Sequence, residues 1–271
     1  MVPKTDRRRR AGASGKSSAA VTSAQVQPKS HAHDAVGSAR LSYANSRPVR
    51  LLVFELENLA VENGRKRVFD SAKQALAGSG SALAPAVFCR IGTEVPPSSF
   101  ISVALQELRV RTSSQQKVKT SFDANCRKAF CEKPALRERL PAILARARQR
   151  GIRAVAISFL DAQMAADLMK ATGLADMGVE LAVGKGWTVH PYQQNVVNQV
   201  LDRLRVNPGT CLALMSSGAG AEAALCAGTR VLAVPDAFTS FQSFSGADEV
   251  LDTWRPEVLE SVLSLDGEGH R

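Results

Sequence analysis

Residues 51–58 restrict the fold of this chain more than any other stretch. They read LLVFELEN, so four apolar residues run directly into a segment with two acids, Glu55 and Glu57. A continuous apolar run of this length is typical of a buried strand in a parallel sheet. Residues two apart on a strand point to the same side, and open α/β sheets place their chemistry at the carboxyl ends of strands. The stretch therefore predicts a carboxylate pair at the functional edge of a sheet.

Strand-like and helix-like segments alternate from residue 141 onward. Buried strands are predicted at 153–158, 179–183, 211–214 and 230–234, and helices at 141–150, 162–172, 193–205, 219–227 and 256–265. Short turns connect them, and glycines such as Gly151 and Gly173 stand where helices end. This order predicts an α/β fold with a doubly wound, mostly parallel sheet.

The chain divides into three regions by composition. Residues 1–49 are rich in Ser, Ala, Lys and Arg and poor in large apolar residues, which predicts an extended, basic, low-complexity tail. Residues 50–61 and 141–271 form the predicted α/β core. Residues 62–140 form a mainly helical insert, with helical spacing at 65–77, 100–110 and 122–130 and a short strand or helix at 86–91.

Positive charge is concentrated outside the core. Residues 1–50 carry ten Lys/Arg and two Asp/Glu, residues 62–140 carry fourteen and seven, and the remainder carries eleven and sixteen. The tail residues Arg7, Arg8, Arg9 and Arg10 and the insert residues Lys117 and Lys119 are the candidate nucleic-acid contacts. The alternatives are a solvated surface and, for the tail, a disordered solubilising segment or an organellar targeting segment.

The five cysteines are scattered and include no CxxC pair, which favours a reducing, intracellular compartment and argues against a zinc site. No run of 18 apolar residues occurs, so no membrane span is expected.

Three motifs resemble those of the haloacid dehalogenase superfamily of phosphohydrolases, in the subtype with a helical cap after the first strand. LPAILARARQRGIRAVAIS resembles the helix, glycine and strand that lead into the second motif of that family. GKGWTVHPY resembles its lysine motif, and NPGTCLALMSSGAGAEAALCAGTRVLAVP resembles its fourth-motif strand, loop and helix. The resemblance covers roughly residues 50–236 and implies a Rossmann-like core.

The resemblance assigns a role to each matching position. Glu55 takes the place of the aspartate that attacks phosphorus, and Glu57 that of the acid–base aspartate. Ser158 and Lys185 take the places of the residues that hold the phosphoryl oxygens. Met215 and Ser216 stand where the family has the Glu-Asp pair that completes a Mg²⁺ site.

These departures lead to the expectation that the chain is catalytically inactive. A glutamate places its oxygen about 1 Å further out than an aspartate, and a misplacement of about 1 Å can cost roughly a hundredfold in rate. The change at Ser216 removes acidic ligands, so no metal is expected unless the chain is active, in which case Mg²⁺ is the cofactor. Lys185 would pair with Glu55 or Glu57 and replace the charge of the ion.

Three functions remain open. The first is an inactive structural or RNA-facing subunit of a larger assembly, such as a mitochondrial ribosome or a related ribonucleoprotein, with RNA and protein partners and no small-molecule substrate. The second is a Mg²⁺-dependent phosphatase that uses Glu55 and Glu57. The third is a module in which Ser158 and Lys185 bind a phosphorylated ligand without cleaving it.

Overall fold

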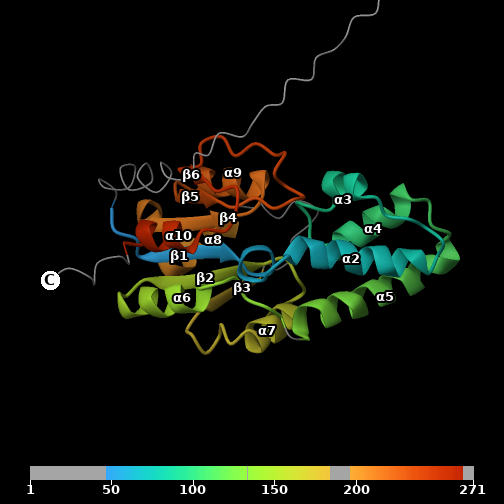
Figure 1. Cartoon of the computed structure of the whole chain (residues 1–271), viewed down its shortest axis with the longest axis horizontal. Coiled ribbons are helices and arrows are strands. Elements are labelled where there is room, and N and C mark those ends of the chain that lie inside the picture. Colours follow the sequence, from blue (N-terminus) through green and yellow to red (C-terminus); the bar gives the residue numbers. More distant parts are fainter. Residues whose placement is uncertain (1–46, 133, 184–195, 265–271) are drawn as a thin grey trace, which may run out of the picture.

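A six-stranded parallel sheet forms the centre of the protein, as a computed structural model that describes residues 47–132, 134–183 and 196–264 shows (Figure 1). The strands stand in the order β3-β2-β1-β4-β5-β6. Their bounds are β1 Leu51–Glu55, β2 Arg153–Ser158, β3 Glu180–Val183, β4 Cys211–Met215, β5 Arg230–Ala233 and β6 Glu249–Val250. Since β1 pairs with both β2 and β4, it is a central strand, and the predicted parallel α/β fold is confirmed.

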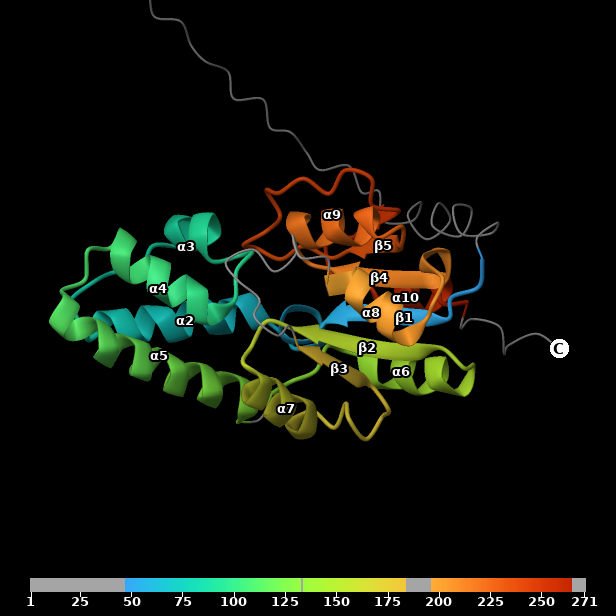
Figure 2. The same ribbon diagram turned by 180° about the vertical axis from the view of Figure 1, so that it is seen from behind.

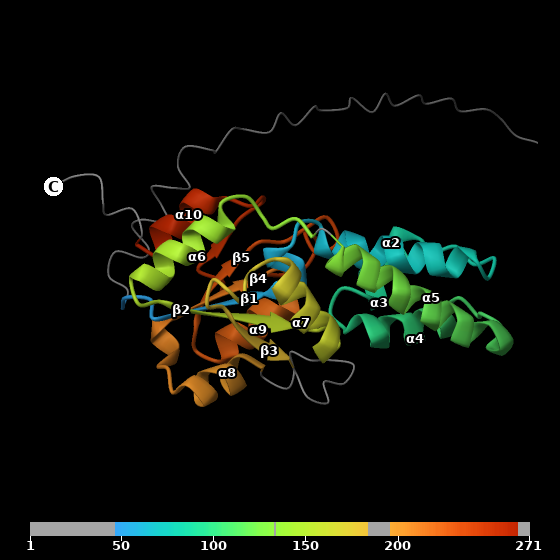
Figure 3. The ribbon, with the colours of Figure 1, turned by 90° about the horizontal axis from the view of Figure 1, so that it is seen from below.

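The side chains of β1 alternate between two hydrophobic clusters, one on each face of the sheet. Leu52 and Phe54 belong to the first cluster, and Leu51 and Val53 to the second. The first cluster includes buried residues of α6 (Leu140–Gln149), α7 (Ala162–Ala171) and α10 (Pro256–Val262), and the second those of α8 (Val196–Leu204) and α9 (Gly218–Cys226). Figure 3 shows α6 and α10 on one side of the sheet and α8 on the other, so the sheet is doubly wound.

The segment between β1 and β2 carries four helices that lie beyond the carboxyl end of β1 (Figures 1 and 2). We call them the helical group. They are α2 (Gly64–Ala77), α3 (Pro85–Ile91), α4 (Pro97–Glu107) and α5 (Thr112–Cys131). Aromatic rings join the group to the sheet side of the molecule. The ring centroid of Phe88 lies 5.0 Å from those of Phe100 and Phe238, and Phe238 belongs to the segment that follows β5.

The structure differs from the sequence-based expectation at the end of the first strand. The strand ends at Glu55, and a single π-helical turn, η1 (Leu56–Ala60), follows it. Glu57 therefore stands on η1 and not on the strand, although both acids are buried. A straight strand would aim both carboxylates at the same neighbours. The turn gives each carboxylate its own hydrogen-bond donors.

Two further differences concern the periphery. Helix α5 begins at Thr112 and includes a polar, basic stretch whose sequence predicts no helix. The stretch is helical because one face of α5 packs against the rest of the protein through four buried residues at every fourth position, Val118, Phe122, Cys126 and Phe130. Strand β6 has two residues and was not predicted, since so short a segment carries no periodicity. The stretch left open at 86–91 is helical, in α3. Within the described ranges, no helix is long and apolar enough to cross a membrane.

Close backbone packing joins η1 to α2 at Gly64. A Cβ atom added there would lie 1.7 Å from the carbonyl oxygen of Glu57 and 3.0 Å from the Cα atom of Asn58. Backbone atoms cannot move aside as a flexible side chain can, so only glycine fits.

We expect Gly64→Ala to lower the free energy of unfolding by about 2 kcal/mol, within the range for overpacking a tight site. Gly78→Ala at the other end of α2 is the matched control, because its added Cβ would meet its nearest neighbour at an ordinary 3.5 Å. Urea denaturation of both variants measures the difference. Equal stabilities would contradict the close packing of η1 on α2.

Candidate active site

Glu55 lies at the carboxyl end of β1 and is fully buried. The backbone N–H of Ser216, just past β4, donates a hydrogen bond of 3.1 Å to Oε1 of Glu55, and the Ser216 hydroxyl donates to Oε2. The Nη2 atom of Arg65 lies 3.6 Å from the same Oε2. A buried carboxylate is strongly unfavourable without donors and an opposite charge, and Glu55 has both.

Glu57 has a separate set of donors at the end of β2. Its Oε2 accepts a hydrogen bond of 2.9 Å from the hydroxyl of Ser158, and its Oε1 accepts one of 2.7 Å from the backbone N–H of Phe159. Burial raises the pKa of Glu57 from 4.5 to about 7, and the nearby charge of Glu55 also raises it, although the two hydrogen bonds oppose the increase. Glu57 can therefore hold or release a proton near neutral pH.

Arg65 is a buried cation in the first turn of α2, with 3% of its side chain exposed. Its Nη1 atom lies 2.7 Å from Oγ of Ser216 and 3.0 Å from Oδ2 of Asp236, and its Nε donates to the carbonyl oxygen of Thr93 at 3.3 Å. Ser216 follows β4, Asp236 follows β5, and Thr93 lies between α3 and α4. The guanidinium therefore connects the helical group to the carboxyl ends of the central strands.

Asp236 is itself held in place by the turn in which it lies. Its Oδ1 accepts a hydrogen bond of 2.8 Å from the N–H of Phe238, and its own N–H donates to the hydroxyl of Thr239 at 3.0 Å. That hydroxyl donates to the carbonyl oxygen of Ser216 at 2.7 Å. Asp236 is therefore fixed against the end of β4.

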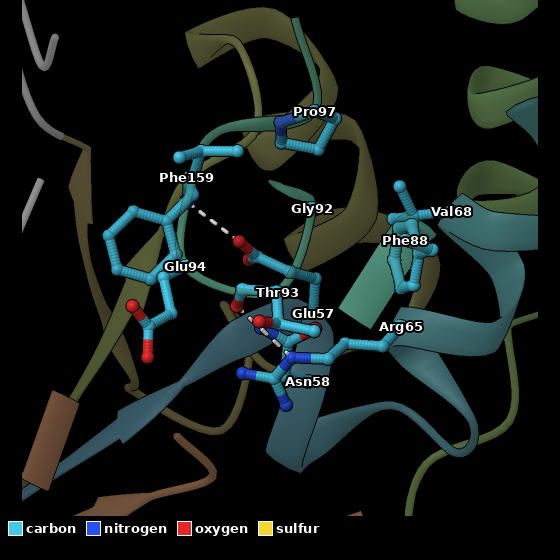
Figure 4. A pocket seen from close by; sticks show the side chains of 11 residues that line it. Glu57, Asn58, Arg65, Val68, Phe88, Gly92, Thr93, Glu94, Pro97 and Phe159 are labelled. Carbon is cyan, nitrogen blue, oxygen red and sulfur yellow. Dashed lines mark hydrogen bonds between the residues drawn. The ribbon is translucent and has the colours of Figure 1, made fainter. Parts of the chain in front are cut away.

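A small cavity lies beside Glu57 and Arg65, as Figure 4 shows. The residues that line it come from η1, α2, α3, the segment between α3 and α4, and the end of β2, and are Glu57, Asn58, Arg65, Val68, Phe88, Gly92, Thr93, Glu94, Val95, Pro97 and Phe159. The cavity has a volume of about 20 Å³ accessible to the centre of a water molecule, which is room for about one water molecule. A second cavity of about 480 Å³ shares Thr93, Glu94 and Val95 with it.

The structure brings together four of the residues that the sequence singled out. Glu55 and Ser216 are in contact, and Glu57 and Ser158 are in contact. Lys185 lies outside the described residues, so its phosphate-binding role and its predicted pairing with an acid stay predictions. The tail residues Arg7, Arg8, Arg9 and Arg10 also lie outside them. Lys117 and Lys119 stand on α5 in the helical group, which is not where the acids meet.

Arg65 and Asp236 are not among the residues that the motifs point to. A signal was present for each. Arg65 stands three residues before Val68, which puts a charged residue on the buried stripe of its helix. Asp236 follows a buried strand by three residues, at the edge of the sheet where such folds place their chemistry. Neither signal says that the two side chains meet, since 171 positions separate them.

The residues around Glu55 do not fit a Mg²⁺ site. Mg²⁺ requires near-octahedral oxygen ligands at short distances. The oxygens of Ser216 and Asp236, which could serve, hold the guanidinium of Arg65. In the described parts of the chain, no group of three or more His, Cys, Asp or Glu side chains is placed to hold a metal ion.

The raised pKa of Glu57 makes stability depend on pH. A group whose pKa is higher in the folded protein stabilises it most below the unfolded pKa, and that contribution is lost as pH rises through the folded pKa. The free energy of unfolding should therefore fall by roughly 3 kcal/mol between pH 4.5 and somewhat above pH 7, relative to Glu57→Gln. Urea denaturation of both proteins across this range measures the difference. Parallel pH profiles would show that burial does not raise this pKa.

Comparison with known proteins gives matches in structure but not in sequence. No family profile and no curated protein matches the chain. CbbY from Rhodobacter sphaeroides, solved in complex with phosphate, aligns with a TM-score of 0.66 and 20% identity over 81% of this chain and 97% of that one. A predicted phosphoglycolate phosphatase from Haemophilus somnus gives 0.63 and 17%, over 76% of this chain and 94% of its own.

A third solved structure is a haloacid dehalogenase-like hydrolase from Streptococcus pneumoniae. It has a TM-score of 0.60 and 14% identity, over 78% of this chain and 97% of its own. Its description and those of the other two name phosphatases, hydrolases or a phosphate complex.

These matches correct the expected function. The interpretation as an inactive, RNA-facing subunit of a ribosome or ribonucleoprotein was wrong, because the structures that this chain resembles are described as a phosphatase, a hydrolase and a protein in complex with phosphate. The error arose from reading Glu55, Glu57 and Ser216 position by position, without the cation of Arg65 that the fold places beside Glu55 and Ser216. At these identities the likeness establishes the architecture, and the chain has the fold of the haloacid dehalogenase superfamily.

Proposed function

We propose that the chain is a phosphate monoester hydrolase in which Glu55 is the nucleophile and Glu57 the general acid and base. The observation that carries the proposal is the pair of buried carboxyl groups with different surroundings. Ser216 and Arg65 hold Glu55 with donors and a positive charge, whereas Glu57 has a pKa of about 7. Two carboxyl groups with different environments are a recurrent arrangement for a nucleophile and a proton donor.

In the first step, an oxygen of the Glu55 carboxylate attacks phosphorus and the bond to the ester oxygen breaks. The product is an acyl phosphate on Glu55. The leaving oxygen takes the proton of the Glu57 carboxyl group. The two hydrogen bonds from Ser216 fix the orientation of the Glu55 carboxylate. They therefore hold the attacking oxygen in place, although a glutamate side chain has one more rotatable bond than an aspartate.

In the second step, Glu57 returns to its protonated form. Its carboxylate takes a proton from a water molecule as that water attacks phosphorus, which releases inorganic phosphate and restores Glu55. The hydroxyl of Ser158 and the backbone N–H of Phe159 hold the Glu57 side chain in position for both steps. The cavity beside Glu57 has room for about one water molecule, which matches the need of this step.

The leaving group would lie in the larger cavity. Its volume is about 480 Å³, within the roughly 300–1,000 Å³ that ligand pockets have. It is formed by α3, the 92–96 segment, α4 and the segment around Gln242, and Arg90 and Glu94 are its charged residues. Since the cavity beside Glu57 holds only about one water molecule, it has to widen when the phosphoryl group enters.

Turnover of phosphate esters tests the proposal. We expect hydrolysis of para-nitrophenyl phosphate that Glu55→Gln abolishes, because the amide cannot form the acyl phosphate. The control is Glu62→Gln, which makes the same change at an exposed acid seven residues away. No turnover by the native protein, or full turnover by Glu55→Gln, would refute the proposal. A thermal shift with phosphate but no turnover would indicate a binding module.

The dependence on leaving group tests the role of Glu57 separately. Glu57→Gln should lower kcat by about 10²–10⁴-fold for alkyl phosphates and much less for para-nitrophenyl phosphate, whose leaving oxygen needs little protonation. In the native protein, kcat for alkyl phosphates should fall as pH rises through about 7, because the acid form is lost. Equal losses for both classes of ester would assign Glu57 a role other than acid.

Narrowing the larger cavity tests the place of the leaving group. Val103→Trp on α4 should raise KM at least tenfold for bulky esters and leave acetyl phosphate unaffected. The control is Gln106→Trp, which adds the same ring one turn further along, on an exposed position outside the cavity. Equal KM values for all esters would remove the larger cavity from the binding site.

A further inference from the structure

Arg65 is placed as a permanent cation against the nucleophile position. Its side chain is 3% exposed, and burial of a charge is tolerated only where opposite charges and hydrogen bonds compensate it. Compensation comes from Ser216 at 2.7 Å, Asp236 at 3.0 Å and Glu55 at 3.6 Å. A guanidinium keeps its charge throughout the accessible pH range, so the positive charge of Arg65 is always present at this site.

The oxygens that hold Arg65 are those that a divalent ion would need. A carboxylate on β1, a hydroxyl and carbonyl oxygen after β4, and a carboxylate after β5 converge at the carboxyl edge of the sheet. Oxygen ligands of this kind suit a hard cation. Here a guanidinium nitrogen already lies between Ser216 and Asp236. A second cation at this place would clash with the guanidinium and be repelled by its positive charge.

We infer that Arg65 supplies the positive charge of this active site and that phosphoryl transfer by this chain requires no divalent metal ion. This inference rests on the proposed hydrolase function. Nη2 of Arg65 lies beside Oε2 of Glu55, so it reduces the repulsion between this carboxylate and an incoming phosphate. The same charge stabilises the equatorial oxygens of phosphorus in the transition state. Arg65 donates hydrogen bonds only, and no proton leaves it at either step.

The fork of the guanidinium makes arginine the required residue at this position. Nη1 contacts Ser216 and Asp236 while Nη2 lies next to Glu55, and Nε is fixed by the carbonyl oxygen of Thr93. A lysine has one nitrogen on a flexible stem and cannot make these contacts from one position. Arg65→Lys should therefore restore only part of the activity that Arg65→Ala loses.

The decisive experiment needs no variant. Hydrolysis of para-nitrophenyl phosphate by the full chain is measured after exhaustive treatment with EDTA, and again with added Mg²⁺ or Mn²⁺. We expect rates that agree within about twofold, because the cation is part of the chain. Turnover that disappears in EDTA and returns with Mg²⁺ would overturn the inference and leave the proposed hydrolase function intact. The absence of turnover under every condition would refute both.

A binding measurement tests the same point without turnover. Titration of the full chain with Mg²⁺ in a calorimeter, and thermal unfolding with Mg²⁺ or EDTA, should show no saturable heat and no change in Tm. A saturable heat or a rise in Tm that Asp236→Asn abolishes would place the metal among the oxygens that hold Arg65 and would overturn the inference.

Chemical rescue separates the charge of Arg65 from its structural role. Arg65→Ala should lower kcat/KM by about 10²–10³-fold, as removal of a transition-state donor does. Guanidinium chloride below denaturing concentrations should restore part of this loss, and equal urea should not. Arg67→Ala is the matched control, since its guanidinium contacts backbone carbonyls away from Glu55. Equal losses in both variants, or rescue of neither, would show that Arg65 only supports the fold.

Discussion

The buried carboxylate of Glu55 at the end of β1 is the constraint on which the rest of the structure depends. A charge without exposure to water, placed between two neighbouring strands, requires donors from outside its own strand. Ser216 supplies two and joins β1 to β4, and Arg65 supplies the opposite charge and joins β1 to α2. Loss of Arg65 would break a buried ion pair, which typically costs about 3–5 kcal/mol.

Most of the core could be predicted from the sequence because its elements carry their own periodicity. The strand at 153–158 was predicted with its observed bounds, since an apolar run after a glycine has few other interpretations. The turn η1 could not be predicted from local sequence. It places Glu57 against Ser158 and Phe159, and these hydrogen-bond donors lie about a hundred positions further along the chain. Long polar helices such as α5 depend on tertiary packing in the same way.

The candidate site could be predicted only in part. Motif positions located Glu55, Glu57, Ser158 and Ser216, because the fold brings the ends of neighbouring strands together. They gave no information about Arg65, whose role arises from a contact with Asp236 across the whole core. In the sequence alone, Ser216 in place of an acid indicates the loss of a metal ligand. In the structure, the hydroxyl of Ser216 contacts both the Glu55 carboxylate and the Arg65 guanidinium, so an arginine balances the carboxylate charge in place of a metal ion.

The position of Arg65 on α2 has a mechanical consequence. Glu55 stands on the sheet, while the cation beside it stands on the helical group, and the ring of Phe238 packs against those of Phe69 and Phe88 of that group. Any motion that draws α2 away from β1 separates the two charges, while the hydrogen bonds from Ser216 to Glu55 stay with the sheet. The positive charge of Arg65 therefore acts on Glu55 only while α2 is packed against the end of β1, so the charge balance at this strand end depends on the position of the helical group.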